Sequence, residues 1–144
     1  FGPGTLAELR EAFAAADEAP HVSAFAPLQA VGDALLQAGF RDPVVDTDSF
    51  TLTYPDLMTL MRELRAIGAT NALDTRRRSL TGKRRIRAAE AAYEAHRRDG
   101  VLPSTWEVIY AQAWGPKPGA PRREAGVDVA HVPVAGIPIR RKPR

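Results

Sequence analysis

The chain has 144 residues, of which 44% are hydrophobic and 26% charged, a size and composition typical of one folded domain. It has no apolar run near the roughly 20 residues of a membrane span and opens without a charged-then-apolar leader, so we expect a cytoplasmic protein. It contains no cysteine, and its three histidines lack the spacing of metal ligands. We therefore expect no disulfide, no thiolate nucleophile and no metal site.

The net charge of +3 conceals an asymmetry between the two halves of the chain. Residues 1–74 hold 4 basic and 11 acidic side chains, whereas residues 75–144 hold 16 basic and 6 acidic ones. Seven of the basic residues lie between Arg76 and Arg87, with no acidic residue among them. Such a run indicates either a surface for an acidic partner or a solvated helix face, and charge alone does not separate the two.

The first predicted element is a helix over residues 5–17. Its apolar residues recur at helical spacing on one face: Leu6, Leu9, Phe13 and Ala16. Thr5 and Glu8 have the spacing of a capping box, in which two side chains bond the first backbone N–H groups of a helix. The pattern therefore predicts both a buried face and a capped start.

A second helix and a strand are predicted next. The helix has three apolar residues on one face: Leu28, Val31 and Leu35. Gly39 stands where a left-handed C-terminal cap is expected. Residues 49–54 then alternate as in a strand, with apolar groups on one side: Phe50, Leu52 and Tyr54.

Two further helices follow in the sequence. A third helix is predicted to begin at Pro55 and to end at Gly68, with this buried stripe: Leu57, Leu60, Met61, Leu64 and Ile67. Arg62 and Arg65 lie off that stripe. A fourth helix is predicted over residues 82–98, with a thin apolar line and basic other faces; the line is Ile86, Ala89 and Tyr93.

The last predicted element is a strand over residues 105–114. It has apolar groups on both sides, which predicts a central strand covered on both faces. Residues 116–144 are rich in proline and arginine, and we expect an extended or disordered tail after a folded part that ends near residue 115. Within the tail, the apolar stretch "VDVAHVPVAGIPI" is expected along a sheet edge or a partner's surface. Two strands leave a doubly covered sheet without neighbours, so the chain is expected to be incomplete.

Four stretches resemble the malonyl-acyl-carrier-protein O-methyltransferases of biotin synthesis, which are class I methyltransferases that use S-adenosylmethionine: "FGPGTLAELREAF", "HVSAF", "LQAVGDALLQAGFRDPVVDTDSFTLTYPDLMTLMRELRAIGATN" and "LTGKRRIRAAEAAYEAHRRDGVLPSTWEVIYAQAWGP". The resemblance covers residues 1 to about 115, and "YPDLMTLMRELRAIGATN" looks like the lid helix between the sixth and seventh strands of that family. It implies an α/β fold, the C-terminal part of a Rossmann-like class I methyltransferase, with about four helices and two antiparallel strands.

The resemblance departs from the family at the cofactor site. The glycine-rich turn and the ribose-binding acid that hold S-adenosylmethionine are absent, and Gly2 and Gly4 form only a short Gly-x-Gly. The resemblance implies S-adenosylmethionine as the cofactor of the parent enzyme. This chain alone is expected neither to bind it nor to catalyse, and to self-associate through an exposed sheet face and edge.

The resemblance places the substrate side and lid of the enzyme in this chain. Methylating a carboxylate requires little acid or base help, because position and desolvation carry the rate. A free malonyl carboxylate needs a clamp, and Arg62 on the lid helix is a candidate for bidentate binding. Further candidate substrate-binding residues are His21, Tyr54, Met58 and Asn71. Each also has a purely structural interpretation, namely an exposed arginine, a capping histidine, a buried tyrosine, a core methionine or a polar loop residue.

The basic run has three interpretations. Acyl carrier proteins are strongly acidic, so the carrier could dock on Arg76, Arg77, Arg78, Lys83, Arg84, Arg85 and Arg87, with charge that speeds encounter and fixes register. The alternative is a basic nucleic-acid-binding module, which the high isoelectric point favours although no reading motif or aromatic platform accompanies it. The third is a structural fragment whose charges only solvate it.

Overall fold

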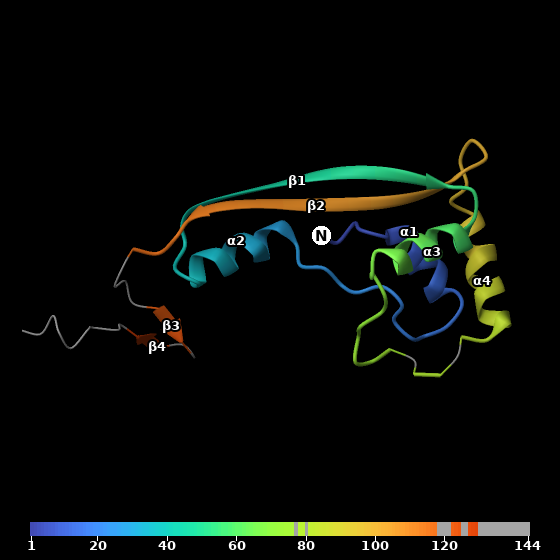
Figure 1. Ribbon diagram of the computed structural model, residues 1–144, viewed down its shortest axis with the longest axis horizontal. Coiled ribbons are helices and arrows are strands. Elements are labelled where there is room, and N and C mark those ends of the chain that lie inside the picture. Colours follow the sequence, from blue (N-terminus) through green and yellow to red (C-terminus); the bar gives the residue numbers. More distant parts are fainter. Residues whose placement is uncertain (77, 80, 118–121, 125–126, 130–144) are drawn as a thin grey trace, which may run out of the picture. The chain divides into compact units, whose positions relative to one another are not determined.

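The computed structural model describes residues 1–76, 78, 79, 81–117, 122–124 and 127–129. The elements in chain order are α1 (Ala7–Ala14), α2 (Leu28–Gln37), β1 (Arg41–Tyr54), α3 (Leu57–Ala66), α4 (Lys83–Glu94), β2 (Leu102–Trp114), β3 (Arg122–Glu124) and β4 (Val127–Val129). β1 and β2 pair as one antiparallel two-stranded sheet, and β3 pairs with β4 in another (Figure 1). The predicted α/β class, with four helices and two long antiparallel strands, is confirmed.

The chain divides into two compact units. The first comprises Phe1–Leu28 and Thr47–Ile109 and holds α1, α3 and α4. The second comprises Gln29–Asp46 and Tyr110–Arg144 and holds nearly all of α2. β1 and β2 each contribute one segment to each of the two units. The buried cluster described below lies wholly in the first unit.

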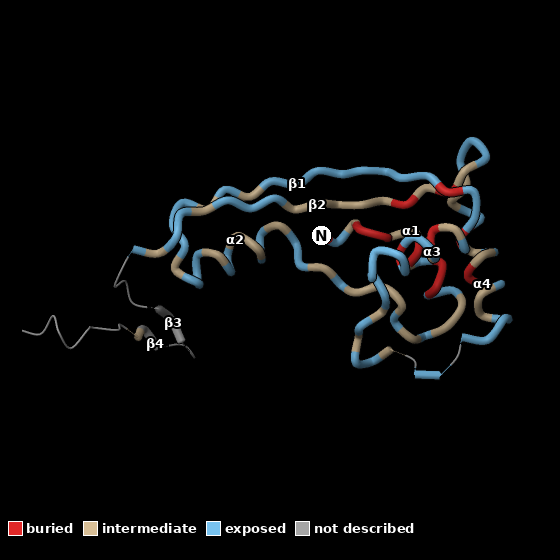
Figure 2. Tube along the Cα trace, viewed as in Figure 1, coloured by how far each residue is buried: buried red, intermediate tan, exposed pale blue. Residues whose placement is uncertain are grey.

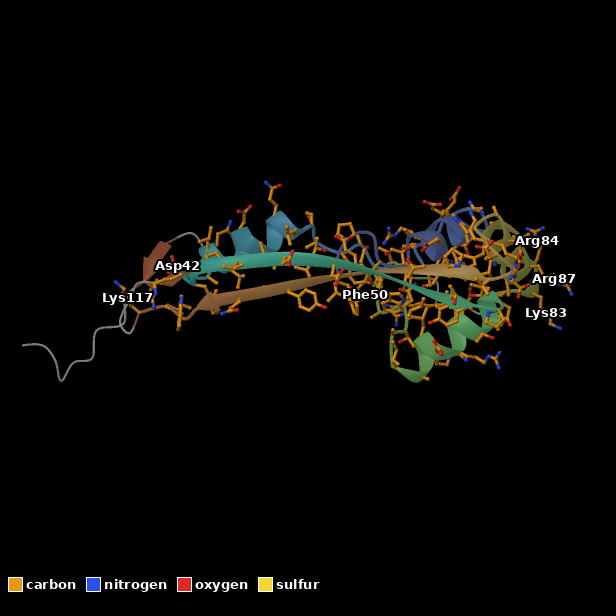
Figure 3. The ribbon with its side chains drawn as sticks, turned by 90° about the horizontal axis from the view of Figure 1, so that it is seen from above. Asp42, Phe50, Lys83, Arg84, Arg87 and Lys117 are labelled. Atoms are coloured by element: carbon orange, nitrogen blue, oxygen red, sulfur yellow. The ribbon has the colours of Figure 1, made fainter. Side chains whose placement is uncertain are left out.

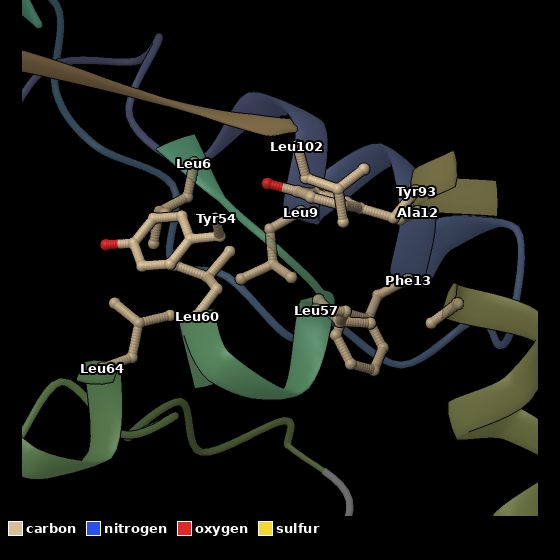
Figure 4. Packing of buried hydrophobic residues seen from close by; sticks show 11 residues of the cluster. Leu6, Leu9, Ala12, Phe13, Tyr54, Leu57, Leu60, Leu64, Tyr93 and Leu102 are labelled. Carbon is tan, nitrogen blue, oxygen red and sulfur yellow. The ribbon is translucent and has the colours of Figure 1, made fainter. Parts of the chain in front are cut away.

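The core of the first unit lies where β1 ends and β2 begins, with α1, α3 and α4 around it (Figures 1 and 2). Figure 4 shows leucine, phenylalanine and tyrosine side chains from these elements in one group. The buried cluster comprises Leu6, Leu9, Ala12, Phe13, Tyr54, Leu57, Leu60, Leu64, Ala89, Tyr93 and Leu102. Each large apolar side chain here contributes about 1.5–3 kcal/mol relative to an exposed position, so this group is the main source of stability in the unit.

Helix α1 is shorter than predicted, and the predicted capping box is wrong. Leu6 stands at the N-cap with φ of 54°, without a side-chain cap. The hydroxyl of Thr5 donates to the backbone oxygen of Glu107 (3.0 Å), while the carboxylate of Glu8 accepts from the backbone N–H of Thr105 (3.1 Å). Both side chains therefore form hydrogen bonds with the backbone of β2, which passes close beside the start of the helix.

Helices α2 and α3 lie where predicted, with one corrected boundary. Gly39 follows α2 with φ of +82° and Gly68 follows α3 with φ of +77°, so both are left-handed positions that glycine adopts without strain. Helix α3 does not begin at Pro55. Its N-cap is Asp56, whose carboxylate accepts from the backbone N–H of Thr59 at 2.7 Å.

Helix α4 ends before the predicted residue 98, since the chain turns back at Arg98, which forms an isolated antiparallel bridge with Val101. The prediction of a doubly covered β2 is wrong for its last part, where Tyr110 is 53% exposed and Trp114 is 67% exposed. Within the described residues this strand pairs only with β1.

The strand β1 also begins earlier than predicted, at Arg41 instead of Ser49. Of the predicted apolar side of this strand, only Tyr54 is buried, whereas Phe50 and Leu52 are exposed. Alternation along the strand is present, but packing covers only its last residue.

The predicted tail is described only in part. β3 and β4 form a short antiparallel hairpin, with Arg122 opposite Val129 and Glu124 opposite Val127. Residues 118–121, 125, 126 and 130–144, which include most of the apolar stretch 127–139, lie outside the described residues. Among the helices that the structure describes, none is both long and apolar enough to cross a bilayer.

Candidate functional site

A hollow of about 260 Å³ opens in the first unit. It is bounded by the start of the chain, the irregular segment after α1, the loop after α3, and β2. Its apolar wall includes Phe1, Leu9, Phe25, Leu64 and Trp106. Its polar residues are Thr5, His21, Ser23, Thr70 and Asn71. The arrangement suits a ligand that is mostly apolar with one polar end.

Three aromatic rings form one side of this hollow. The ring of Phe1 lies edge-on to Trp106, with centroids 5.5 Å apart, and to Phe25, with centroids 5.9 Å apart. Edge-to-face contacts of this kind add stability beyond burial alone. The indole N–H of Trp106 is buried and has no hydrogen-bond partner among the described residues.

The polar end is formed by two predicted site residues that lie far apart in the sequence. The ring of His21 stacks on Phe13 with centroids 4.1 Å apart. The amide nitrogen of Asn71 donates to the backbone oxygen of Pro20 (2.7 Å), and its oxygen accepts from the backbone N–H of Leu73 (3.1 Å). The fold thus brings His21 and Asn71 to the same hollow, and substrate binding by them stays a prediction.

A second hollow, of about 180 Å³, shares His21 and Asn71 with the first and adds Arg65. Arg62 lies on neither wall, because its guanidinium bonds back to its own helix, at the Met58 backbone oxygen (3.3 Å) and the hydroxyl of Thr59 (3.0 Å). Met58 is 42% exposed and also lines neither hollow. Substrate binding by Arg62 and Met58 stays a prediction.

Arg65 is a cation that the sequence analysis did not select. It follows the buried Leu64 directly and lies beside the partly buried Met61, at the border of the apolar stripe of α3. Its position at the border of the apolar stripe was the sequence signal that could have identified Arg65, because a long side chain there can reach a hollow beside the stripe.

Tyr54 is buried, and its hydroxyl donates to the carboxylate of Glu63 at 2.6 Å. Burial, followed by the bond to Glu63 and the negative charge of that residue, raises the pKa of Tyr54 to about 12. The hydroxyl therefore stays protonated at neutral pH. Tyr54 lines a separate hollow of about 420 Å³, which shares Leu64 and Trp106 with the first hollow.

The basic run does not form one uniform surface. Lys83, Arg84 and Arg87 are exposed on α4, and Figure 3 shows them projecting outward from this helix. Arg85 instead lies with its Nε atom 3.4 Å from Oδ2 of Asp17. Of the remaining predicted docking residues, Arg78 is exposed, Arg76 bonds the backbone oxygen of Leu73 at 2.9 Å, and Arg77 lies outside the described residues.

The Gly-x-Gly at the start of the chain does not fit a cofactor cradle. The backbone N–H of Gly2 donates to the backbone oxygen of Glu107 (2.8 Å), and that of Gly4 donates to its carboxylate (2.6 Å). Both N–H groups are thus used inside the protein, and a β-carbon at either glycine would overlap the Glu107 side chain. Gly2 and Gly4 therefore offer no free backbone N–H group to a cofactor. Over the described ranges, no three His, Cys, Asp or Glu side chains gather as they would around a metal ion.

Comparison with known proteins gives the relatives of this chain. No family model matches it. It is 57% identical, over 99% of its length, to the malonyl-[acyl-carrier protein] O-methyltransferase of Xylella fastidiosa, and this match covers 48% of that protein. It is 49% identical over 82% of its length to the protein of the same name from Nitrosospira multiformis, covering 38% of it. It is 45% identical over 99% of its length to the one from Halorhodospira halophila, covering 48% of it.

These relatives define the class as that of the methyltransferases, in agreement with the α/β arrangement described above. The chain belongs to the malonyl-[acyl-carrier protein] O-methyltransferase family, as predicted from its sequence. It spans about half the length of the curated relatives that it matches.

Proposed function

We propose that the whole protein methylates the free carboxylate of a malonyl thioester held on an acyl carrier protein, in biotin synthesis. Residues 1–115 form the acceptor and lid side of that enzyme. The observation that carries this proposal is the hollow with an aromatic wall and a polar end at His21 and Asn71, in a chain 57% identical to a protein of that name. The methyl donor, S-adenosylmethionine by family, is not assigned to these residues.

The residues of the hollow suit this acceptor. A carboxylate is already a nucleophile, so the acceptor side has to place it and to remove water from it. Phe1, Phe25 and Trp106 provide an apolar wall that can exclude water, and His21 lies on the lining with Asn71, whose amide holds the Pro20 and Leu73 backbone. No general acid or base is required of them.

Two arginines on α3, Arg62 and Arg65, are candidates for binding the malonyl carboxylate, and comparing their alanine variants can distinguish them. Arg65 lines the second hollow and Arg62 does not, so we favour Arg65 over the arginine predicted from sequence. In the full-length enzyme, Arg65→Ala should lower kcat/KM for the malonyl carrier by about 10- to 100-fold, the effect of losing a charge-assisted hydrogen bond. Arg62→Ala should stay near wild type. The reverse order of the two losses would restore Arg62 as the clamp.

The docking face for the acidic carrier is proposed to be the outer side of α4. Lys83, Arg84 and Arg87 are exposed there, whereas Arg85 is used on Asp17. Three positive charges on one helix face attract an acidic helix and orient it before contact, which raises the association rate. The phosphopantetheine arm of the carrier would then reach the hollow.

Charge reversal tests this docking face. Lys83→Glu, Arg84→Glu and Arg87→Glu together, in the full-length enzyme, should lower kcat/KM for the carrier-bound substrate and weaken its dependence on salt. Turnover of a small malonyl thioester should be unchanged, because none of the three residues lines the hollow. Lys117→Glu, an exposed change outside α4, is the control. Equal loss on both substrates would refute docking at this face.

The same variants address a nucleic-acid-binding role, which the basic composition alone suggests. Wild type should bind an acidic carrier protein with stronger salt dependence than the charge-reversed variant and should show no comparable preference for duplex DNA. Tighter binding to DNA than to the carrier, lost on charge reversal, would favour the nucleic-acid interpretation.

A further inference from the structure

The basic residues of α4 are divided between two faces. Lys83, Arg84 and Arg87 are exposed, whereas Arg85 has its Nε atom 3.4 Å from Oδ2 of Asp17. The side chain of Asp17 is only 5% exposed and that of Arg85 is 36% exposed. One arginine of the run thus reaches inward to a buried carboxylate directly after α1.

Asp17 contacts two residues of the segment that contains His21. Its Oδ1 atom accepts from the backbone N–H of Ala19 at 2.6 Å and lies 3.3 Å from Nε2 of His21. A buried carboxylate is stable only where charge and hydrogen bonds compensate its lost hydration. Among the described residues, Arg85 supplies a permanent positive charge to this group, since a guanidinium stays protonated at any ordinary pH.

The segment from Glu18 to Val22 has no regular secondary structure, so side-chain contacts decide its path. Three of them come from three different places. Arg85 holds it from α4 through Asp17, Phe13 holds it from α1 by stacking on His21, and Asn71 holds it from the loop after α3 through Pro20. Two of these three anchors, Phe13 and Asn71, belong with His21 to the walls of the second hollow.

We propose that Arg85 is a positioning residue of the hollow: its ion pair with Asp17 keeps the Glu18–Val22 segment folded inward, and this places the His21 ring in the wall. Without the guanidinium, the buried carboxylate is under-compensated, and the segment lowers its free energy by moving outward to let Asp17 reach water. His21 then leaves Phe13. Arg84, one residue earlier and exposed, has no such role.

For catalysis, this inference rests on the proposed function. A carrier that docks on the outer face of α4 would meet a helix whose inner arginine orders the acceptor wall. Docking would thus depend on Lys83, Arg84 and Arg87, and the order of the pocket on Arg85 of the same helix. The structural part of the inference, that Arg85 orders His21, is independent of what the hollow binds.

The first test uses NMR on the 144-residue chain, with Arg85→Ala compared with Arg84→Ala. A ring stacked on another aromatic ring has displaced proton shifts, so the His21 ring signals, assigned with His21→Gln, report its contact with Phe13. The amide exchange of Ala19 reports its bond to Asp17. In Arg85→Ala the ring shifts should move toward free histidine, and Ala19 should exchange about 10-fold faster or more. Arg84→Ala should change neither.

A double-mutant cycle separates the ion pair from a general effect on folding. Asp17→Asn alone should change the His21 signals less than Arg85→Ala does, because it removes the buried charge together with the need for its partner. Adding Arg85→Ala to Asp17→Asn should change little more, for the same reason. Arg85→Lys should give an intermediate result, since it keeps the charge but not the guanidinium geometry. If Arg85→Ala does not fold, Arg85→Lys carries the comparison with Arg84→Ala.

Kinetics in the full-length enzyme complete the test. Arg85→Ala should lower turnover of the small malonyl thioester and of the carrier-bound substrate alike, by about 10-fold, as expected for a displaced wall. Unchanged His21 signals and Ala19 exchange in Arg85→Ala, or additive effects in the cycle, would overturn the inference. An enzyme without methyltransferase activity would refute the proposed function and leave the NMR result standing.

Discussion

Glu107 on β2 holds the opening turn of the chain, and it does so at two positions that need glycine. Its backbone oxygen and its carboxylate accept the N–H groups of Gly2 and Gly4, and its side chain fills the space where their β-carbons would stand. The carboxylate also accepts from the hydroxyl of Thr47 on β1 (3.4 Å). Glycine is needed here for close approach of backbone and side chain.

We predict that Gly4→Ala lowers the free energy of unfolding by about 1–3 kcal/mol, the usual cost of forcing atoms into filled space. Gly115→Ala, where no atom lies within 4 Å, should change it little. Urea unfolding measures both. The cost of Gly4→Ala should shrink in a Glu107→Ala background, because the overlapping side chain is gone. An equal cost in both backgrounds would show that the overlap is not its cause.

Tyr54 gives a prediction about alkaline pH. Its pKa is raised by burial and by Glu63 to about 12, so the fold favours the protonated hydroxyl. The stability that it confers is complete below about pH 10, the pKa of an unperturbed tyrosine, and is lost as pH rises toward 12. Tyr54→Phe should therefore be less stable than wild type by about 1 kcal/mol near pH 9. This deficit should shrink near pH 11 in urea unfolding; a constant deficit would contradict the shift.

At the scale of elements, α3 is the clearest case of one helix with two functions. Its inner stripe of Leu57, Leu60 and Leu64 belongs to the core, while Met58 and Arg62 lie on its exposed side. Arg65 stands between these two faces and lines the second hollow. The helix is therefore fixed by one face, and its border can present a side chain to a ligand.

A matched pair on α3 tests this division. Leu60→Ala should lower the free energy of unfolding by about 2–5 kcal/mol, since Leu60 is 0% exposed and its removal leaves a cavity. Met58→Ala should stay within about 0.5 kcal/mol, because Met58 is exposed. The two midpoints in urea give the comparison. A large loss for Met58→Ala would mean that a further layer covers the outer side of α3.

For the whole molecule, the two units differ in packing. The buried cluster belongs to the first unit, and α2, described throughout, contributes no buried residue. Large apolar side chains are exposed along β1 and β2, among them Val44, Phe50, Tyr110 and Trp114. Exposed apolar groups on a strand pair favour association with another surface.

We therefore predict that the 144-residue chain forms dimers or larger oligomers at micromolar concentration. Light scattering with size exclusion measures the mass. The substitutions Phe50→Ser and Trp114→Ser should shift the population toward the monomer, because they remove apolar groups that are exposed in the isolated chain. A monodisperse monomer for the unsubstituted chain would contradict this prediction.

A second prediction at this scale concerns the cofactor. The chain has no glycine-rich cradle, and its short Gly-x-Gly is engaged with Glu107. Calorimetric titration of the 144-residue chain with S-adenosylmethionine should therefore show no measurable binding. Binding at micromolar concentration would show that these residues form a donor site after all.

The sequence by itself determined the features that depend on local backbone geometry and on family likeness. The helical stripes of α1, α3 and α4 were readable because the period of a helix is local, although Ile67, predicted in the α3 stripe, is 69% exposed. Gly39 and Gly68 were readable because a left-handed cap favours glycine. The family was recognisable from continuous stretches such as "YPDLMTLMRELRAIGATN", and the relatives confirm it.

Only the tertiary structure decided which side chains meet across long separations. Thr5 and Glu8 looked like a cap by spacing, yet both bond to β2, about a hundred residues away in sequence. Arg85 looked like its neighbours in the basic run, yet it reaches Asp17. No periodicity encodes such pairs, because they depend on where the folded backbone returns. The division of α4 into an exposed basic face and an inner arginine is therefore a property of the fold.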